Sequence, residues 1–293
     1  MHKRLPLSRF DIFTSFAPMV DMGFFVEHKE APFNKKTSKF SAVNAWWLAD
    51  CSRLAYVRDQ KFVRKTLKVA GFTKVKFFDK KGTQCFVASN RSTVIVAFRG
   101  TEANKELTDL LADLNAIPVS SDVAGYVHQG FKKALDLIWN DLTKYLDTLT
   151  KGKRTVWYTG HSLGAAIATL AAARRTGNGL YTFGSPRVGT KKFVKAMKTP
   201  TFRVANTHDI VTRVPPPIGF RHVGELKFIG ADGIIRTNPG MWSRFYQRIG
   251  GNEWKILLLL FKLIVSKSKM EFILSYLHDH SPYNYSVFMW NNI

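Results

Sequence analysis

The chain contains a G-x-S-x-G pentapeptide, Gly160-His161-Ser162-Leu163-Gly164, in a setting that suits a nucleophilic serine. An apolar segment precedes it and an Ala-rich helical pattern follows, so the serine would lie in a sharp strand-to-helix turn. The two glycines lack the Cβ atoms that would clash in so tight a turn. The helix dipole would favour negative charge developing beside the hydroxyl. Such a pentapeptide also occurs by chance, so it is this context that predicts a catalytic role for Ser162.

A serine nucleophile requires a general base, and the base requires an acid that orients it. In this setting the acid and then the histidine follow the serine along the chain. Asp209 comes after a short predicted strand and a loop, where acids often serve a site, and we take it as the acid. The histidines beyond it are His222, His278 and His280, and chain order alone does not choose between them. His161 adjoins the serine, but successive side chains in a turn point apart, so we do not expect it to be the base.

Predicted strands and helices alternate along the chain, as the positioning of such a site requires. The predicted strands are Gln84–Ala88, Thr93–Phe98, Thr155–Tyr158, Gly179–Phe183 and Thr201–Val204. The predicted helices cover Ala42–Tyr56, 104–113, 129–148 and 163–175. The strand ending at Phe98 is apolar from Val94 onward, which is typical of a strand buried on both faces. The alternation predicts an α/β fold with a mostly parallel central sheet flanked by helices on both faces.

Composition narrows the class of protein. The 293 residues are 45% hydrophobic and 22% charged, which excludes bulk disorder. Two cysteines exclude a disulfide scaffold and a four-cysteine zinc module. The apolar run that begins at Ile256 is broken at Lys262, far short of the roughly 20 residues of a membrane-spanning helix. Residues 12–20 faintly resemble a signal peptide, but flanking aspartates favour a non-signal segment. We expect an N-terminal extension over 1–40 and one domain over 41–293.

The net charge is the unusual property of this chain. Forty-four Lys and Arg against 21 Asp and Glu give +23, with a sequence pI of about 10.1. So large a surplus predicts attraction to polyanions such as an anionic membrane or nucleic acid. The sequence contains no recognised nucleic-acid motif, so we expect an anionic lipid interface as the partner and no nucleic acid. We expect a cytoplasmic or membrane-peripheral location, with secretion and the oligomeric state left open.

Seven stretches occur in the order in which they occur in the class 3 lipases, the fungal triacylglycerol-lipase type, which this chain resembles. They are Phe98–Thr101, Asp109–Leu114, Val127–Phe131, Thr159–Gly164, Phe183–Gly189, Asn206–Pro216 and Gly219–Gly224. The resemblance extends over roughly residues 40–285. Any one of these stretches would be weak evidence, but seven in the same order are specific. The resemblance implies an α/β-hydrolase fold, and it makes 41–293 a class 3 lipase-like domain.

The resemblance also implies site roles. Ser162 matches the nucleophile and Asp209 the acid of the triad. The family's base lies in an Asp-His-x-x-Tyr pattern, which Asp279–Tyr283 matches, so His280 is implied as the base with His278 as its competitor. His222 matches a structural position of the family.

An oxyanion hole needs at least two donors aimed at the tetrahedral oxygen. Leu163 follows the nucleophile, so its backbone N–H is expected to be one donor. Thr101 matches the family's second donor, and it could contribute both its N–H and its hydroxyl. Asp113 matches an acid that supports that residue in relatives, or it is an ordinary exposed carboxylate.

Two segments have the spacing of lipid-binding elements. Asn104–Ala112 places three leucines at helical spacing, as an amphipathic lid or as an ordinary surface helix packed on the core. Residues 252–277 are nearly all apolar with one narrow polar stripe, which fits either a membrane-interface helix or a buried one. Both alternatives stay open for both segments.

The sequence therefore predicts a serine-triad carboxylester hydrolase that acts on lipid esters, with triacylglycerols or other acylglycerols as the leading substrate. A phospholipase A1-like activity on anionic membranes is the alternative, and a non-catalytic basic membrane-binding module is the rival from another class. No cofactor or metal is required by this chemistry. The run His278-Asp279-His280 is not favoured as a metal site, because no further ligand stands at zinc-like spacing.

Overall fold

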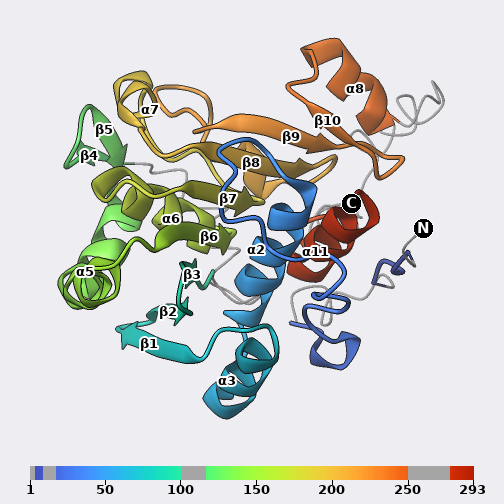
Figure 1. Cartoon of the computed structure of the whole chain (residues 1–293). Coiled ribbons are helices and arrows are strands. Elements are labelled where there is room, and N and C mark those ends of the chain that lie inside the picture. The colour runs from blue at the N-terminus through green and yellow to red at the C-terminus, as the bar shows by residue number, and fades with distance from the viewer. Residues whose placement is uncertain (1–3, 9–17, 101–116, 250–277) are drawn as a thin grey trace.

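The computed structural model describes residues 4–8, 18–100, 117–249 and 278–293. Its centre is an eight-stranded sheet of order β1-β2-β3-β6-β7-β8-β9-β10 (Figure 1). The strands are β1 (Lys74–Lys80), β2 (Thr83–Ser89), β3 (Thr93–Phe98), β6 (Thr155–His161), β7 (Gly179–Phe183), β8 (Thr201–Asn206), β9 (Glu225–Ile229) and β10 (Ile235–Thr237). Strands β3, β6, β7, β8 and β9 pair in parallel, and the remaining strands add antiparallel edges.

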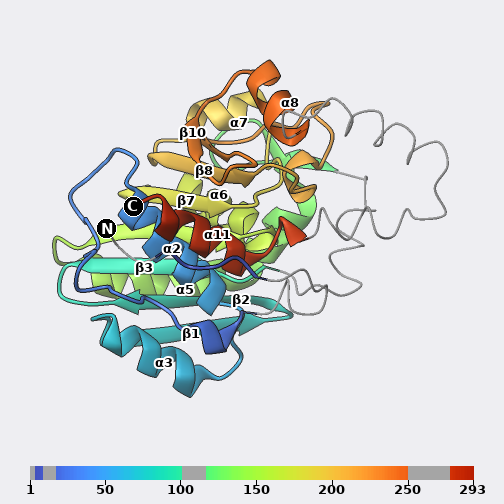
Figure 2. The ribbon, with the colours of Figure 1, turned by 90° about the vertical axis from the view of Figure 1, so that its right-hand side faces the viewer.

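Helices cover both faces of this sheet (Figure 2). One face carries α2 (Ala42–Leu54) and α11 (Pro282–Asn291), and the other carries α5 (Gln129–Thr150) and α6 (Leu163–Arg174). The alternation along β3 shows the two layers, because Ile95 and Ala97 pack with the α2 side and Val94, Val96 and Phe98 with the α5 side. Every residue of β3 and β7 is buried, as expected for parallel strands covered on both faces.

The remaining described elements lie around this core. They are η1 (Val20–Met22), α3 (Gln60–Val69), β4 (Pro118–Ser120), β5 (Tyr126–His128), α7 (Lys191–Ala196), η2 (Val211–Arg213) and α8 (Met241–Ile249). Strands β4 and β5 form a separate two-stranded sheet, and α3 and α8 lie at opposite ends of the large one (Figures 1 and 2). No helix among the described residues is long and apolar enough to cross a membrane.

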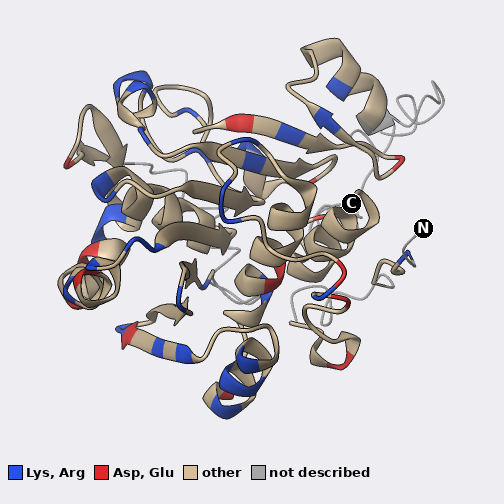
Figure 3. Ribbon diagram, viewed as in Figure 1, with Lys and Arg blue, Asp and Glu red and all other residues tan. Residues whose placement is uncertain are grey.

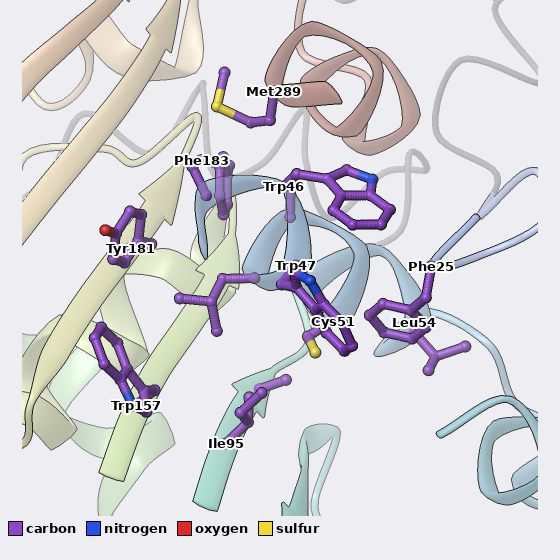
Figure 4. Packing of buried hydrophobic residues seen from close by; sticks show 14 of the residues in the cluster. Phe25, Trp46, Trp47, Cys51, Leu54, Ile95, Trp157, Tyr181, Phe183 and Met289 are labelled. Carbon is purple, nitrogen blue, oxygen red and sulfur yellow. The ribbon is translucent and has the colours of Figure 1, made fainter. Parts of the chain in front are cut away.

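Helix α2 runs through the centre of one face and is buried almost all round, from Asn44 to Leu54. The Ser41 side chain caps it by accepting a hydrogen bond from the backbone N–H of Asn44. Trp46 and Trp47 meet edge to face with ring centroids 5.8 Å apart, and Trp46 also packs on Trp290 of α11 (Figure 4). A helix that is buried all round needs partners on every side, and here the sheet and α11 supply them.

The described part of residues 1–40 packs into this core. Phe25 belongs to the buried cluster around α2, and its backbone N–H donates to Asp50 Oδ2 at 2.7 Å. Asp50 pairs with Arg53 at 3.1 Å and accepts a bond from Ser286 of α11 at 2.6 Å. One buried carboxylate therefore ties three separate segments together. The division of the chain at residue 40 stays a prediction.

Most of the elements predicted from the sequence are present. Strands β3 and β7 have the predicted bounds, whereas β6 and β8 extend farther, to His161 and Asn206. The sequence analysis did not place β1, β9, β10, α3, α8 or α11. The predicted helix over 104–113, the lid question at Asn104–Ala112 and the apolar segment 252–277 lie outside the described residues.

Candidate active site

Ser162 lies at the turn between β6 and α6, where the pentapeptide predicted it. Its φ is +59°, a conformation that side-chain-bearing residues rarely adopt, and its backbone N–H is anchored to Phe183 O at 3.0 Å. A Cβ atom on Gly160 would lie 2.3 Å from the backbone of Gly164, and one on Gly164 would lie 2.3 Å from Phe98 O. The glycines are therefore required by the close approach of the helix to the strands, as the sequence analysis argued.

The candidate acid and the candidate base are far apart in the sequence, and their side chains meet in the buried interior. Strand β8 leads to Asp209, and His280 precedes α11, with the two side chains fully buried. His280 Nδ1 lies 2.8 Å from Asp209 Oδ2. The same oxygen accepts the hydroxyl of Tyr285 at 2.7 Å, and Oδ1 accepts the backbone N–H of Val211 at 2.9 Å. The buried carboxylate is thus held in one orientation by three partners.

Tyr285 is a site residue that the sequence analysis missed. Burial and the nearby Asp209 carboxylate raise its pKa well above the usual value, so the phenol stays protonated and donates. Its oxygen also accepts the backbone N–H of Asn206 at 2.9 Å. One hydroxyl therefore links α11 to both the end of β8 and the acid. Only tertiary packing shows this role, because no local pattern marks the tyrosine.

The loops that carry the acid and the base are also joined to each other. Asn206 Nδ2 donates to the backbone oxygen of Asp279 at 3.1 Å. His208 Nδ1 lies 3.1 Å from Asp279 Oδ2, and the backbone N–H of His208 donates to the same oxygen at 3.1 Å. Asp279 therefore turns toward His208 while His280 turns toward Asp209, so the run His278-Asp279-His280 does not converge on one point.

Gly184 packs directly against the buried pair. It follows β7 with φ +59°, and a Cβ atom there would lie 2.7 Å from Asp209 Oδ2 and 2.8 Å from His280 Nδ1. Only glycine leaves room for the carboxylate and the imidazole in this position. In the sequence, Gly184 was visible only as part of a stretch shared with class 3 lipases.

His161 is engaged through both ring nitrogens. Its Nε2 lies 2.7 Å from the backbone oxygen of His280, which can only accept, so Nε2 carries the proton. Burial, with a further contribution from His280, lowers the pKa of His161 well below 6.5, so the ring is neutral and Nδ1 accepts from Tyr56 Oη at 2.9 Å. Its ring packs on that of His280 with centroids 4.3 Å apart. His161 is therefore placed to support His280, and both of its nitrogens have partners other than Ser162.

The other predicted site residues lie as follows. Leu163 opens α6, where a first-turn N–H has no partner within the helix. His278 lies beside Asn284, with Nε2 and Nδ2 3.4 Å apart. His222 donates to Thr212 O at 2.9 Å, and burial followed by Arg203 lowers its pKa well below 6.5. Thr101 and Asp113 lie outside the described residues.

The serine hydroxyl itself is buried and, among the residues that the structure describes, makes no hydrogen bond. The structure thus brings Asp209 and His280 into contact and places Ser162 at the turn next to His161, whose ring packs on His280. A buried hydroxyl on a strained turn, next in sequence to a histidine whose ring packs on the imidazole held by Asp209, provides the components for nucleophilic attack on a carbonyl carbon. In such sites the bond from serine to histidine often tightens only when substrate binds.

The strand order, the strand–turn–helix around Ser162 and the helices on both faces define an α/β-hydrolase fold. Residues 95–218 match the family described as Lipase (class 3). This central part of the chain is therefore similar to the class 3 lipases.

Known lipases and phospholipases resemble this chain in both sequence and structure. The chain is 32% identical over 191 residues to phospholipase A(1) DAD1, chloroplastic, of Arabidopsis thaliana, covering 56% of this chain and 41% of that protein. It is 34% identical over 157 residues to secreted mono- and diacylglycerol lipase 1 of Fusarium solani, covering 49% and 46%. The triacylglyceride lipase of Rhizomucor miehei superimposes with a TM-score of 0.53 at 27% identity, over 66% of this chain and 81% of that one. The chain thus spans less than half the length of these two curated relatives.

Proposed function

We propose that this protein hydrolyses the carboxylic esters of lipids, with acylglycerols as the substrate. The observation that carries the proposal is the buried contact of 2.8 Å between His280 and Asp209, with the His280 ring packed on His161, the residue before Ser162 in the elbow. The mono- and diacylglycerol lipase named above and the family support the substrate class. The net charge of +23 supports an anionic lipid surface as the place of action.

In the proposed reaction, Ser162 Oγ attacks the ester carbonyl carbon and its proton passes to His280 Nε2. Asp209 stays ionised and holds the imidazolium through Nδ1. The oxyanion that forms accepts hydrogen bonds from the Leu163 N–H and from Thr101. When the intermediate collapses, the leaving alcohol takes the proton from His280. Water then attacks the acyl-serine ester, with His280 again accepting the proton. When this second intermediate collapses, His280 returns the proton to Ser162 Oγ and the fatty acid departs.

A second candidate is the removal of one acyl chain from a glycerophospholipid. It is favoured by the similarity to proteins named phospholipase A(1) in Arabidopsis thaliana and Oryza sativa. The same three residues would carry out this reaction, since the bond cleaved is again a carboxylic ester. The two candidates differ only in the rest of the bound lipid.

Turnover of three substrates by the full chain tests both candidates. A water-soluble short-chain ester reports the chemistry, and fatty acid release from a triacylglycerol emulsion and from phosphatidylglycerol vesicles reports the substrate. Ser162→Ala and His280→Ala should each lower kcat about 10³-fold or more. Ser52→Ala, which removes another buried hydroxyl, is the matched control and should retain turnover. Full activity in Ser162→Ala would overturn the proposal, and no turnover by the wild type would favour the non-catalytic module.

A further inference from the structure

Helix α8 is oriented with its apolar side outward. Met241 and Trp242 are each 70% exposed, Phe245 is 43% exposed and Tyr246 is 64% exposed. The residues of α8 that turn toward the protein are polar, namely Arg244 and Gln247, both half-buried. A surface helix of a water-soluble protein normally has the opposite arrangement. This outward apolar face of α8 is built largely of aromatic rings, and Phe245 lies close to both Trp242 and Tyr246.

The polar side of α8 faces the hairpin formed by β9 and β10. The space beside Gly230, at the turn of this hairpin, is occupied by Gln247 Oε1 and by the guanidinium of Arg236. Arg236 in turn forms an ion pair of 2.5 Å with Asp232, and this bond lowers the pKa of Asp232 to about 2. The polar side of the helix therefore lies against the protein, and its aromatic residues face outward.

The charge around α8 is positive. The two acidic residues of the hairpin, Glu225 and Asp232, are already paired with Lys227 at 3.3 Å and with Arg236. Helix α8 contains arginine but no Asp or Glu, and Figure 3 shows no acidic colour on it. Arg244 also lies close enough to the almost fully buried Arg203 to contribute to lowering its pKa, which burial brings to about 10.

We propose that α8 is the element by which this protein docks on an anionic lipid surface, with Trp242, Phe245 and Tyr246 entering the boundary between headgroups and acyl chains. A helix with an aromatic face and cationic flanks lies in the plane of such an interface. Aromatic rings with a polar edge favour this depth, and the positive charge favours anionic headgroups. A protein partner would satisfy the apolar face equally well, but the surplus of cations and the nature of the substrate favour lipid. The inference rests on the proposed function, because it supplies the surface on which a lipid ester would be reached.

Vesicle co-sedimentation tests this docking independently of the chemistry. All proteins carry Ser162→Ala, so that the vesicles stay intact. The variant Trp242→Ala/Tyr246→Ala removes the two most exposed rings, and Tyr126→Ala removes a ring that is 53% exposed on β5, as the matched control. The vesicles are phosphatidylcholine alone or an equimolar mixture of phosphatidylcholine and phosphatidylglycerol.

The double variant should bind the anionic vesicles about tenfold more weakly or worse, because two buried rings are lost. Tyr126→Ala should bind like the parent protein, and the parent should bind phosphatidylcholine alone more weakly. Equal binding by the double variant and the parent would overturn the proposal. So would a shift in the oligomeric state of the double variant without a change in vesicle binding, which would assign α8 to a protein contact.

The same double variant with its native Ser162 should hydrolyse a water-soluble short-chain ester at the wild-type rate. Loss of vesicle binding with retained ester turnover separates docking from catalysis. If the wild type binds vesicles through α8 but hydrolyses no ester, the proposed function fails while the docking surface stands.

Discussion

Gly184→Ala should lower turnover far more than its effect on stability would suggest. An alanine Cβ would lie 2.7 Å from Asp209 Oδ2, whereas ordinary van der Waals contact begins near 3.4 Å. The carboxylate or the imidazole must then move by about 0.7 Å, the difference between these distances. A misplacement of about 1 Å can cost about 100-fold in rate, so we expect kcat to fall about 10- to 100-fold.

The backbone cost of this substitution can be separated from its effect on the site. Alanine at a positive φ costs about 1–2 kcal/mol, and Gly82→Ala has the same cost at φ +82°, with nothing within 4 Å of its added Cβ. Gly82→Ala should lower the free energy of unfolding in urea by about 1–2 kcal/mol, and Gly184→Ala should lower it by more, because its Cβ also overlaps the buried pair. Only Gly184→Ala should lower kcat on a short-chain ester. Wild-type kcat in Gly184→Ala, or an equal loss in Gly82→Ala, would refute the reasoning.

Three further substitutions, one of them with an exposed control, test the buried polar groups. Tyr285→Phe removes the phenol from Asp209 and should lower the free energy of unfolding by about 1.5–3 kcal/mol, with a several-fold loss of kcat. Asp50→Ala should cost about 3–5 kcal/mol in urea unfolding, because it leaves a buried guanidinium without its carboxylate, whereas Asp141→Ala, from an exposed pair, should leave the free energy of unfolding nearly unchanged. Burial lowers the pKa of His222 well below 6.5, so its contribution to stability is complete above about pH 6.5 and is lost as the pH falls toward the folded-state pKa. His222→Gln should therefore reduce the decline in unfolding free energy between about pH 7 and pH 5, and an unchanged decline would contradict the assigned burial.

Local pattern was sufficient for the elements nearest the chemistry. Strand β3 is apolar from Val94 onward and β7 is apolar apart from Thr182, and the turn at Ser162 has glycines where the backbone packs most closely. Edge strands gave no such signal, because β1 alternates lysines with half-buried residues and β10 is only three residues long. Helix α11 looks polar in sequence, since tyrosines, asparagine and serine open it, yet most of these residues are buried. Their polar atoms are satisfied by distant segments, which sequence alone does not show.

At the candidate site, too, local sequence pattern predicts some residues but not the contacts between distant segments. Ser162 follows from a local pattern, and Asp209 from its place after a strand. His280 and His278 stand two residues apart, and no periodicity distinguishes them. In the structure His280 lies against Asp209 while His278 lies beside Asn284, a difference produced by tertiary contacts.

The long interval between Asp209 and His280 does not enter the geometry of the pair. Asp279 contacts Asn206 and His208, so the segment just before the base is fixed to the segment just before the acid. Tyr285, three residues into α11, reaches back to Asp209 from the far side of the base. Helix α11 itself packs along α2. The base is therefore held by contacts both before and after it in the sequence. Chain inserted between these contacts can vary in length and composition at little cost to the pair, since loop closure entropy grows only slowly with loop length.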